Sequence, residues 1–248
     1  MLKNVLTIAA WSKALRRSLF TWIVAQPCWH CNLVSENGLA LCQACLIKLE
    51  SPSDSCHRCG QPLLANADVC GHCLNLPAPQ AHTLSAFTYT GVIKQIIQRI
   101  KYSPHPGLAR TLSHAVCQQI DSLLTESTVT AVVPIPSHRQ RLRERGFNLP
   151  VLLAKAIAKR FNWSYQPELL RKISATPPQT GQSRHQRQAQ IKGSFAAHSK
   201  TVQHLTILLV DDVLTTGATV AEATACLLQA GATHVTVLTA AVTTKPSA

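Results

Sequence analysis

Four Cys-x-x-Cys pairs limit what the first third of this chain can fold into. They are Cys28–Cys31, Cys42–Cys45, Cys56–Cys59 and Cys70–Cys73, and each begins 14 residues after the previous one. Two thiolates separated by two residues can bind one tetrahedral ion, whereas disulfide scaffolds rarely show such regular spacing. The array therefore predicts two structural zinc ions, each held by four cysteines.

Equal spacing does not by itself decide which pairs share an ion. Between Cys31 and Cys42 the dipeptide Asn37-Gly38 favours a two-residue hairpin turn over Leu33–Leu41, which would bring the first two pairs together as in a zinc ribbon. By analogy the last two pairs form the second site, and a crossed pairing is the alternative. Three histidines inside or beside the pairs are expected to be spacers, with ligation in place of a cysteine as the alternative: His30, His57 and His72.

The segment before the first pair, residues 1–27, is predicted to be an amphipathic helix. Its apolar residues recur at helical spacing, for example Ile8, Trp11, Leu15 and Leu19. Packing on protein is the favoured use, and binding to a membrane surface is the alternative. Basic residues interrupt every apolar run, so neither a transmembrane span nor a secretion signal is expected. Cysteine pairs without a secretion signal indicate the cytoplasm.

Composition favours a folded, basic protein. Hydrophobic residues make up 46% of the 248 residues, which is enough for a sizeable core. Lysine and arginine number 24 against 11 acids, a net charge of +13 that favours polyanionic partners. Between Arg139 and Lys192 there are twelve basic residues and two acids, or +10. This stretch indicates a phosphate or nucleic-acid site, with a solvated basic face as the alternative.

Beyond residue 80, strand patterns alternate with helix patterns. The expected strands are 83–89, 129–133, 206–210 and 234–242, and the expected helices are 91–102, 108–124, 149–161 and 219–229. This alternation predicts an α/β fold with a doubly wound, mainly parallel sheet. The predicted domains are therefore a double zinc ribbon over residues 28–78 and an α/β domain over residues 80–245.

One loop in this region indicates a ligand. The apolar run Ile207–Val210 is followed by Asp211 and Asp212, by a loop of hydroxyl and glycine residues, and then by a helix. Such a loop turns backbone N–H groups and a helix N-terminus toward one phosphate. The two carboxylates suit sugar hydroxyls, contacted directly or through hydrated magnesium. A ribose 5-phosphate would satisfy both features, and an ordinary capped strand and turn is the alternative.

This strand, acid pair and threonine-glycine loop resemble the signature of the phosphoribosyltransferase family. The resemblance implies that Asp211 and Asp212, the catalytic-site acids, hold the ribose hydroxyls of phosphoribosyl pyrophosphate. It also implies that the 5-phosphate lies in a loop made by Leu214, Thr215, Thr216, Gly217, Ala218 and Thr219. Magnesium would accompany the pyrophosphate.

The cysteine pairs, together with the string Arg141-x-x-x-Arg145-Gly146-Phe147-Asn148, are similar to the ComF family, which includes GntX-type proteins. The likeness covers about residues 28–243 and implies a role in competence and in the uptake or utilisation of DNA. A loop after the strand at residues 129–133 and a lid over residues 174–190 would supply cations or hydrogen-bond donors to the pyrophosphate. The candidates, with surface charge or an exposed loop as the alternative, are Ser137, His138, Arg139, Arg141, Arg145, Arg184 and Arg187.

Two functions follow from these features. The first is a magnesium-dependent phosphoribosyltransferase or a relative that binds phosphoribosyl pyrophosphate or a nucleotide, although no residue stands out as a general base. The second is a non-catalytic accessory protein of DNA uptake, which binds single-stranded DNA or competence partners through its zinc ribbons and its arginine-rich face. Aromatic residues make up only 5% of the chain, which argues against an extensive base-stacking platform.

Overall fold

The computed structural model describes residues 26–52, 54–61, 63, 67–74, 81–103, 105–124, 128–137, 147–173, 193–197 and 199–243. The chain divides into two compact units, residues 1–48 and residues 49–248. The first cysteine cluster lies in the first unit and the second cluster in the second unit. The predicted amphipathic helix lies outside the described residues, apart from its last two positions.

The first unit is built around its first Cys-x-x-Cys pair. The strand β1 (Gln26–Pro27) pairs antiparallel with β2 (Val34–Ser35), and the short helix α2 (Gln43–Ile47) follows. The hairpin expected over residues 33–41 is wrong. The strand β2 pairs with β1, which precedes it, and not with the residues that follow the Asn37-Gly38 turn. The cysteine turn itself reverses the chain, since Cys28 N–H donates to the carbonyl of Leu33 at 2.7 Å.

The second unit contains a five-stranded sheet with the order β3-β9-β8-β4-β5, in which every neighbouring pair is parallel. Its strands are β3 (Ala81–Thr88), β4 (Ala131–Pro134), β5 (Ser164–Tyr165), β8 (Thr206–Leu214) and β9 (His234–Val242). The mainly parallel α/β fold expected from the sequence is therefore confirmed.

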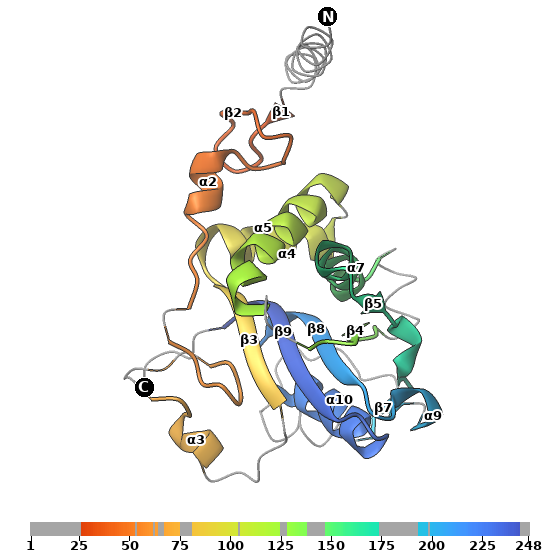
Figure 1. Ribbon diagram of the computed structural model, residues 1–248. Helices are drawn as coiled ribbons and strands as arrows, with labels where there is room; N and C mark the ends of the chain where they lie inside the picture. Colours follow the sequence, from red (N-terminus) through yellow and green to blue (C-terminus); the bar gives the residue numbers. More distant parts are fainter. Residues whose placement is uncertain are drawn as a thin grey trace, which may run out of the picture. The chain divides into compact units, whose positions relative to one another are not determined.

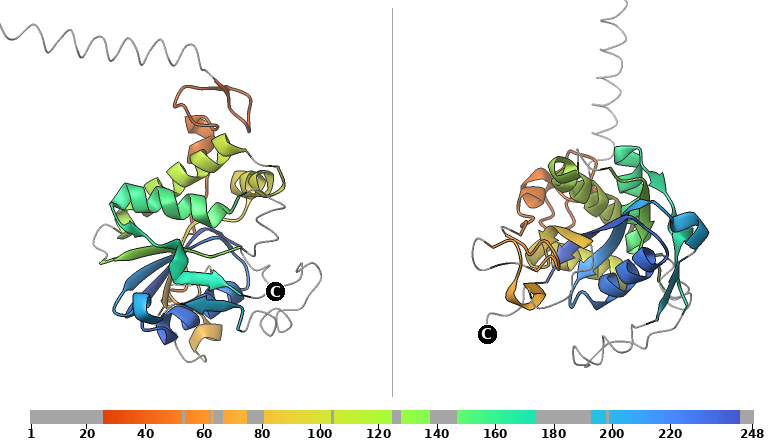
Figure 2. Two further views of the ribbon diagram at one scale, coloured as in Figure 1. Left: turned by 90° about the vertical axis from the view of Figure 1, so that its right-hand side faces the viewer. Right: turned by 60° about the horizontal axis from the view of Figure 1, so that its bottom comes forward.

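Helices cover both faces of this sheet (Figures 1 and 2). On one face lie α4 (Gly91–Tyr102), α5 (Pro106–Leu124) and α7 (Leu149–Phe161), and on the other lies α10 (Ala218–Gln229). Parallel strands buried on both faces are continuous apolar runs, and the run from Ile207 to Val210 is at most 1% exposed. The doubly wound arrangement is confirmed.

Short elements that the sequence pattern did not reveal complete the second unit. They are α3 (Gly71–Leu74), the 3-10 turn η1 (Pro167–Leu169), β6 (Leu170–Lys172), β7 (Phe195–Ala197) and α9 (Ser199–Val202). The strands β6 and β7 form a separate antiparallel pair. None of the described helices has the length and apolar character that crossing a membrane requires.

Candidate functional site

The eight paired cysteines gather into two groups of four. The described sulfur atoms cluster as Cys28, Cys31, Cys42 and Cys45, and as Cys56, Cys59, Cys70 and Cys73, with all four sulfurs of a group within 4.8 Å of one another. This confirms that the first two Cys-x-x-Cys pairs form one site and the last two form the other, and it excludes the crossed arrangement. Neither group includes a histidine.

The sulfur spacing fits a tetrahedral zinc ion. A Zn–S bond of about 2.3 Å places two sulfurs about 3.8 Å apart in a tetrahedron. The Sγ atoms of Cys31 and Cys42 are 3.6 Å apart, and those of Cys59 and Cys70 are 3.7 Å apart. Each group therefore has the donor set and the spacing of a structural zinc site.

Backbone donors favour the thiolate form at one cysteine of each cluster. Burial opposes charge on Cys28, but backbone N–H groups, first that of Cys42, lower its pKa to about 6. Burial likewise opposes charge on Cys56, whose pKa is nevertheless lowered to about 7 by backbone N–H groups, first that of Cys70. The latter N–H lies 3.2 Å from the Cys56 sulfur. Because zinc binds the thiolate, these donors favour metal binding.

The acid pair, Asp211 and Asp212, lies near the carboxyl end of the strand β8, at the carboxyl edge of the sheet. This strand runs through both acids to Leu214 and so extends beyond the expected 206–210. Successive side chains on a strand point to opposite faces, so Asp212 shares the face of α4 while Asp211 faces the other way. The Asp212 backbone N–H donates to Asp211 Oδ1 at 2.8 Å.

The environment of Asp211 favours its protonated form. Burial, and then the neighbouring Asp212, raise the pKa of Asp211 to about 7, against an ordinary value of 3.8. The Asp212 backbone N–H and the cations Lys101 and Lys172 act in the opposite direction. A carboxyl with such a raised pKa beside a second carboxyl is typical of functional sites.

A lysine that the sequence analysis missed reaches this acid pair from α4. Lys101 Nζ lies 2.9 Å from Asp212 Oδ2, and the two side chains are 24% and 18% exposed. Burial raises the pKa of nearby Tyr89, while Lys101 opposes that shift and Asp212 adds to it. No local sequence pattern marks these contacts, because Lys101 and Tyr89 approach the acids only through the tertiary fold.

The expected phosphate loop joins β8 to α10. Residues 215–217 form the connection, and Ala218 and Thr219 begin the helix. Gly217 caps the helix with φ +77°, a left-handed conformation that favours glycine. The first N–H groups of an α-helix have no partner within the helix, so this end can receive an anion.

The loop after β4 lies beside the acid pair at the same edge of the sheet. Ile135 N–H donates to the carbonyl of Val210 at 2.8 Å, directly before Asp211. Asn148, which precedes α7, holds this loop with two bonds. Its Nδ2 donates to the carbonyl of Ile135 at 3.1 Å, and its Oδ1 accepts from Ser137 Oγ at 2.9 Å. The asparagine of the Arg-Gly-Phe-Asn string thus fixes the position of Ser137.

The other candidates for pyrophosphate contact lie outside the described residues. They are His138, Arg139, Arg141, Arg145, Arg184 and Arg187. The described part of the site therefore comprises the acid pair, Lys101, the loop into α10 and the start of the loop after β4.

Comparison with known proteins adds two family matches. Residues 19–74 match the double zinc ribbon domain, and residues 150–248 match the phosphoribosyl transferase domain. The chain is 28% identical over 215 residues to the DNA utilization protein YhgH of Salmonella typhimurium, covering 85% of this chain and 94% of that one. It is 28% identical over 218 residues to Competence protein F of Haemophilus influenzae, with the same coverage. The chain therefore combines a double zinc ribbon with a phosphoribosyltransferase domain, as its resemblance to the ComF family implies.

The chain is also similar to a third curated relative and to solved structures. Competence protein ComFC of Bacillus subtilis is 26% identical over 212 residues, covering 82% of this chain and 84% of that one. Among solved structures, glutamine phosphoribosylpyrophosphate amidotransferase from Bacillus subtilis matches with a TM-score of 0.40 and 17% identity, covering 58% of this chain and 30% of that one. Adenine phosphoribosyltransferase from Saccharomyces cerevisiae matches with a TM-score of 0.36 and 18% identity, covering 54% and 70%.

Proposed function

We propose that this protein is of the ComF type, that it binds phosphoribosyl pyrophosphate or a related nucleotide at the carboxyl edge of its sheet, and that it serves DNA uptake or utilisation in the cytoplasm. The observation that carries the proposal is the continuous path from the acid pair on β8, through residues 214–217, to the N-terminus of α10. In this proposal Asp211 and Asp212 accept hydrogen bonds from the ribose hydroxyls. The loop and the helix N-terminus hold the 5-phosphate.

The pyrophosphate would lie toward the loop after β4. Ser137 supplies a hydroxyl there, and Asn148 keeps that hydroxyl in place. We propose that further positive charge comes from the rest of this loop and from residues 174–190. The side chains concerned are His138, Arg139, Arg141, Arg145, Arg184 and Arg187. Magnesium, bound with the pyrophosphate, would neutralise its charge and assist its departure in a transfer reaction.

Binding and turnover are tested separately. Calorimetric titration of the purified protein with ribose 5-phosphate, and with phosphoribosyl pyrophosphate plus magnesium, should show saturable 1:1 binding. Absence of binding for both ligands would reject the proposed site. A screen for pyrophosphate release across free nucleobases then distinguishes a transferase, which releases it, from a protein that only binds.

Lys101→Met is expected to shift the pH dependence of sugar-phosphate binding. In this proposal Asp211 accepts a ribose hydrogen bond best when it is deprotonated, so affinity should increase as the pH rises through about 7. Lys101 holds the pKa of Asp211 down, so its removal should move the profile to higher pH. Titrations between pH 6 and 9 measure this shift. Lys94→Met, an exposed change on the same helix, is the control, and equal profiles for both variants would contradict the role of Lys101.

A second candidate function, binding of single-stranded DNA by an accessory protein, is favoured by a groove between α5 and α7. The groove has a volume of about 710 Å³ and a largely apolar floor. Its lysine, arginine and histidine side chains are Arg110, His114, Lys159 and Arg160, and none of the described residues that line it is a carboxylate. Arg160 is paired with Asp121 at 2.5 Å. A row of cations along an apolar groove is complementary to a phosphate backbone.

The double variant Arg110→Ala, Lys159→Ala is expected to weaken binding of an oligothymidine strand. Losing two phosphate contacts should reduce the dependence of log affinity on log salt by about 1.4 for a single strand. Fluorescence anisotropy at several salt concentrations gives this slope. The charge-matched control is Lys94→Ala, Arg99→Ala on exposed positions of α4. If both double variants lose the same affinity, the groove has no special role.

A further inference from the structure

The second cysteine cluster contacts the loop proposed to bind phosphate. Gln61, two positions after the cluster residue Cys59, donates from Nε2 to the carbonyl of Thr215 at 3.1 Å. The two residues are 154 positions apart in the chain, so this bond is a tertiary contact. Gln61 is only 8% exposed, which shields the bond from water.

The neighbouring Gly60 brings the backbone of the cluster directly against the same loop. A Cβ at this position would lie 2.9 Å from Cδ2 of Leu214 and 2.7 Å from Cγ2 of Thr83. Both distances are shorter than real Cβ contacts allow, and φ at Gly60 is +65°. Only glycine lets the chain turn here while it packs on the residue that begins the phosphate loop.

The turn that carries both residues is closed by the cluster itself. Gly60 N–H donates to the carbonyl of Cys56 at 2.7 Å, and Cys56 N–H donates to the carbonyl of Gln61 at 2.8 Å. Cys56 and Cys59 are both in the second group of sulfurs. An ion bound by these sulfurs would fix the turn at two points and so hold Gln61 in place.

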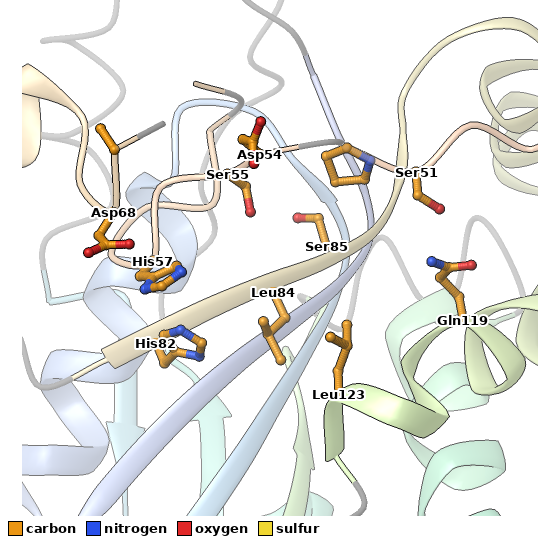
Figure 3. Close-up of a pocket in the computed structure, with 12 residues that line it drawn as sticks. Ser51, Asp54, Ser55, His57, Asp68, His82, Leu84, Ser85, Gln119 and Leu123 are labelled. Carbon is orange, nitrogen blue, oxygen red and sulfur yellow. The ribbon is translucent and has the colours of Figure 1, made fainter. Parts of the chain in front are cut away.

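The same turn is anchored to the edge strand β3. Thr83 N–H donates to the carbonyl of His57 at 2.8 Å, and Thr83 Oγ1 donates to the carbonyl of Arg58 at 2.9 Å. The rings of His57 and His82 face each other edge to face at 5.0 Å, within a pocket between the cluster segment and β3 (Figure 3). The turn is therefore held against the strand β3 as well as against the phosphate loop.

Gln61 carries a cost that an apolar residue would avoid. Its Oε1 is buried and has no hydrogen-bond partner among the described residues. A buried acceptor left unpaired is unfavourable, so the value of this side chain lies in the N–H that it donates to Thr215.

We propose that Gln61 and Gly60 are positioning residues for the phosphate loop, through which metal binding at the second cluster strengthens the binding of a sugar 5-phosphate. The identity of the ligand in this inference rests on the proposed function. The contacts of Gln61 and Gly60 with the loop do not depend on it. The thiolate cluster is thus a regulatory element, because removal of its metal by a chelator would release the loop.

The test compares Gln61→Met with Gln118→Met in the full-length protein. Methionine keeps the length of glutamine but cannot donate, and Gln118 is an exposed residue of α5. For Gln61→Met we expect about tenfold weaker binding of ribose 5-phosphate by calorimetry, the usual effect of one lost hydrogen bond. We also expect several-fold faster hydrogen exchange at the amides of residues 215–219 in the protein without ligand. The melting temperatures of both variants are measured as well, so that weaker binding can be distinguished from a general loss of stability.

Equal affinity and equal exchange in the two variants would overturn the inference while leaving the proposed function intact. If the unaltered protein binds no sugar phosphate, the proposed function fails instead, and the exchange rates still decide whether the cluster positions the loop. Cys70→Ser, with bound zinc measured, extends the test to the metal. It should show the same exchange increase at residues 215–219, and unchanged exchange after loss of one zinc would contradict the coupling. Should Cys70→Ser fail to fold, Gln61→Met decides the question alone.

Discussion

Asp211→Asn is expected to raise the melting temperature at pH 7.5 and to abolish sugar-phosphate binding. The pKa of Asp211 is about 7 in the folded protein and close to 3.8 in the unfolded chain. As the pH rises from about 4 to 7, the unfolded chain releases this proton while the folded protein retains it, so folding is progressively destabilised. Above pH 7 the penalty is complete, on the order of a few kcal/mol. Asparagine carries no such penalty.

Thermal unfolding at pH 4 and pH 7.5, with calorimetry at pH 7.5, measures both effects. The gain in melting temperature should be roughly 5 °C or more at pH 7.5 and should nearly vanish at pH 4. Asp121→Asn, on an exposed carboxylate paired with Arg160, is the control and should change neither property greatly. Residues of functional sites often reduce the stability of the fold while they are required for ligand binding, and this is the result expected for Asp211. A less stable Asp211→Asn, or one that binds normally, would contradict the assignment.

Loss of a cluster cysteine is expected to have the second large effect. Elemental analysis should find two zinc ions per chain, and Cys45→Ala should retain one. Structural zinc sites contribute roughly 10 kcal/mol or more to the folding of small metal-binding modules. Limited proteolysis should therefore cut Cys45→Ala within residues 28–48, a segment that we expect to resist cleavage in the unaltered protein.

Cys117→Ala is the matched control for this change. Cys117 is a buried cysteine of α5 outside both clusters, so its replacement should leave two zinc ions and an intact N-terminal region. Two zinc ions retained in Cys45→Ala, or full resistance to proteolysis after zinc is removed, would contradict structural zinc binding.

Features encoded in short stretches of sequence were predictable. The buried run of β8, the glycine at the start of α10 and the amphipathic pattern of α4 are local, and each element lies where the sequence indicated. The four Cys-x-x-Cys pairs predicted both clusters, because the spacing that binds zinc is itself local. The extension of β8 through the acids was missed, since charged residues interrupt the apolar pattern.

Features that depend on tertiary contacts were not predictable. The Asn37-Gly38 turn suggested a hairpin, but the cysteine turn at Cys28 reverses the chain and sets the register instead. Lys101 reaches Asp212 from a helix more than a hundred residues earlier in the chain, and Gln61 reaches Thr215 in the same way. No local pattern distinguishes these residues from an exposed lysine or a loop glutamine.

The most direct test of the central claim is to follow the backbone amides of residues 215–219 by nuclear magnetic resonance while ribose 5-phosphate and magnesium are added. Direct donation to a phosphate should move these signals downfield, with the largest changes at the start of α10. The account predicts saturable shifts centred on this loop and a smaller response around the acid pair. Amide signals that stay unchanged at saturating ligand, or shifts confined to another part of the sheet, would contradict it.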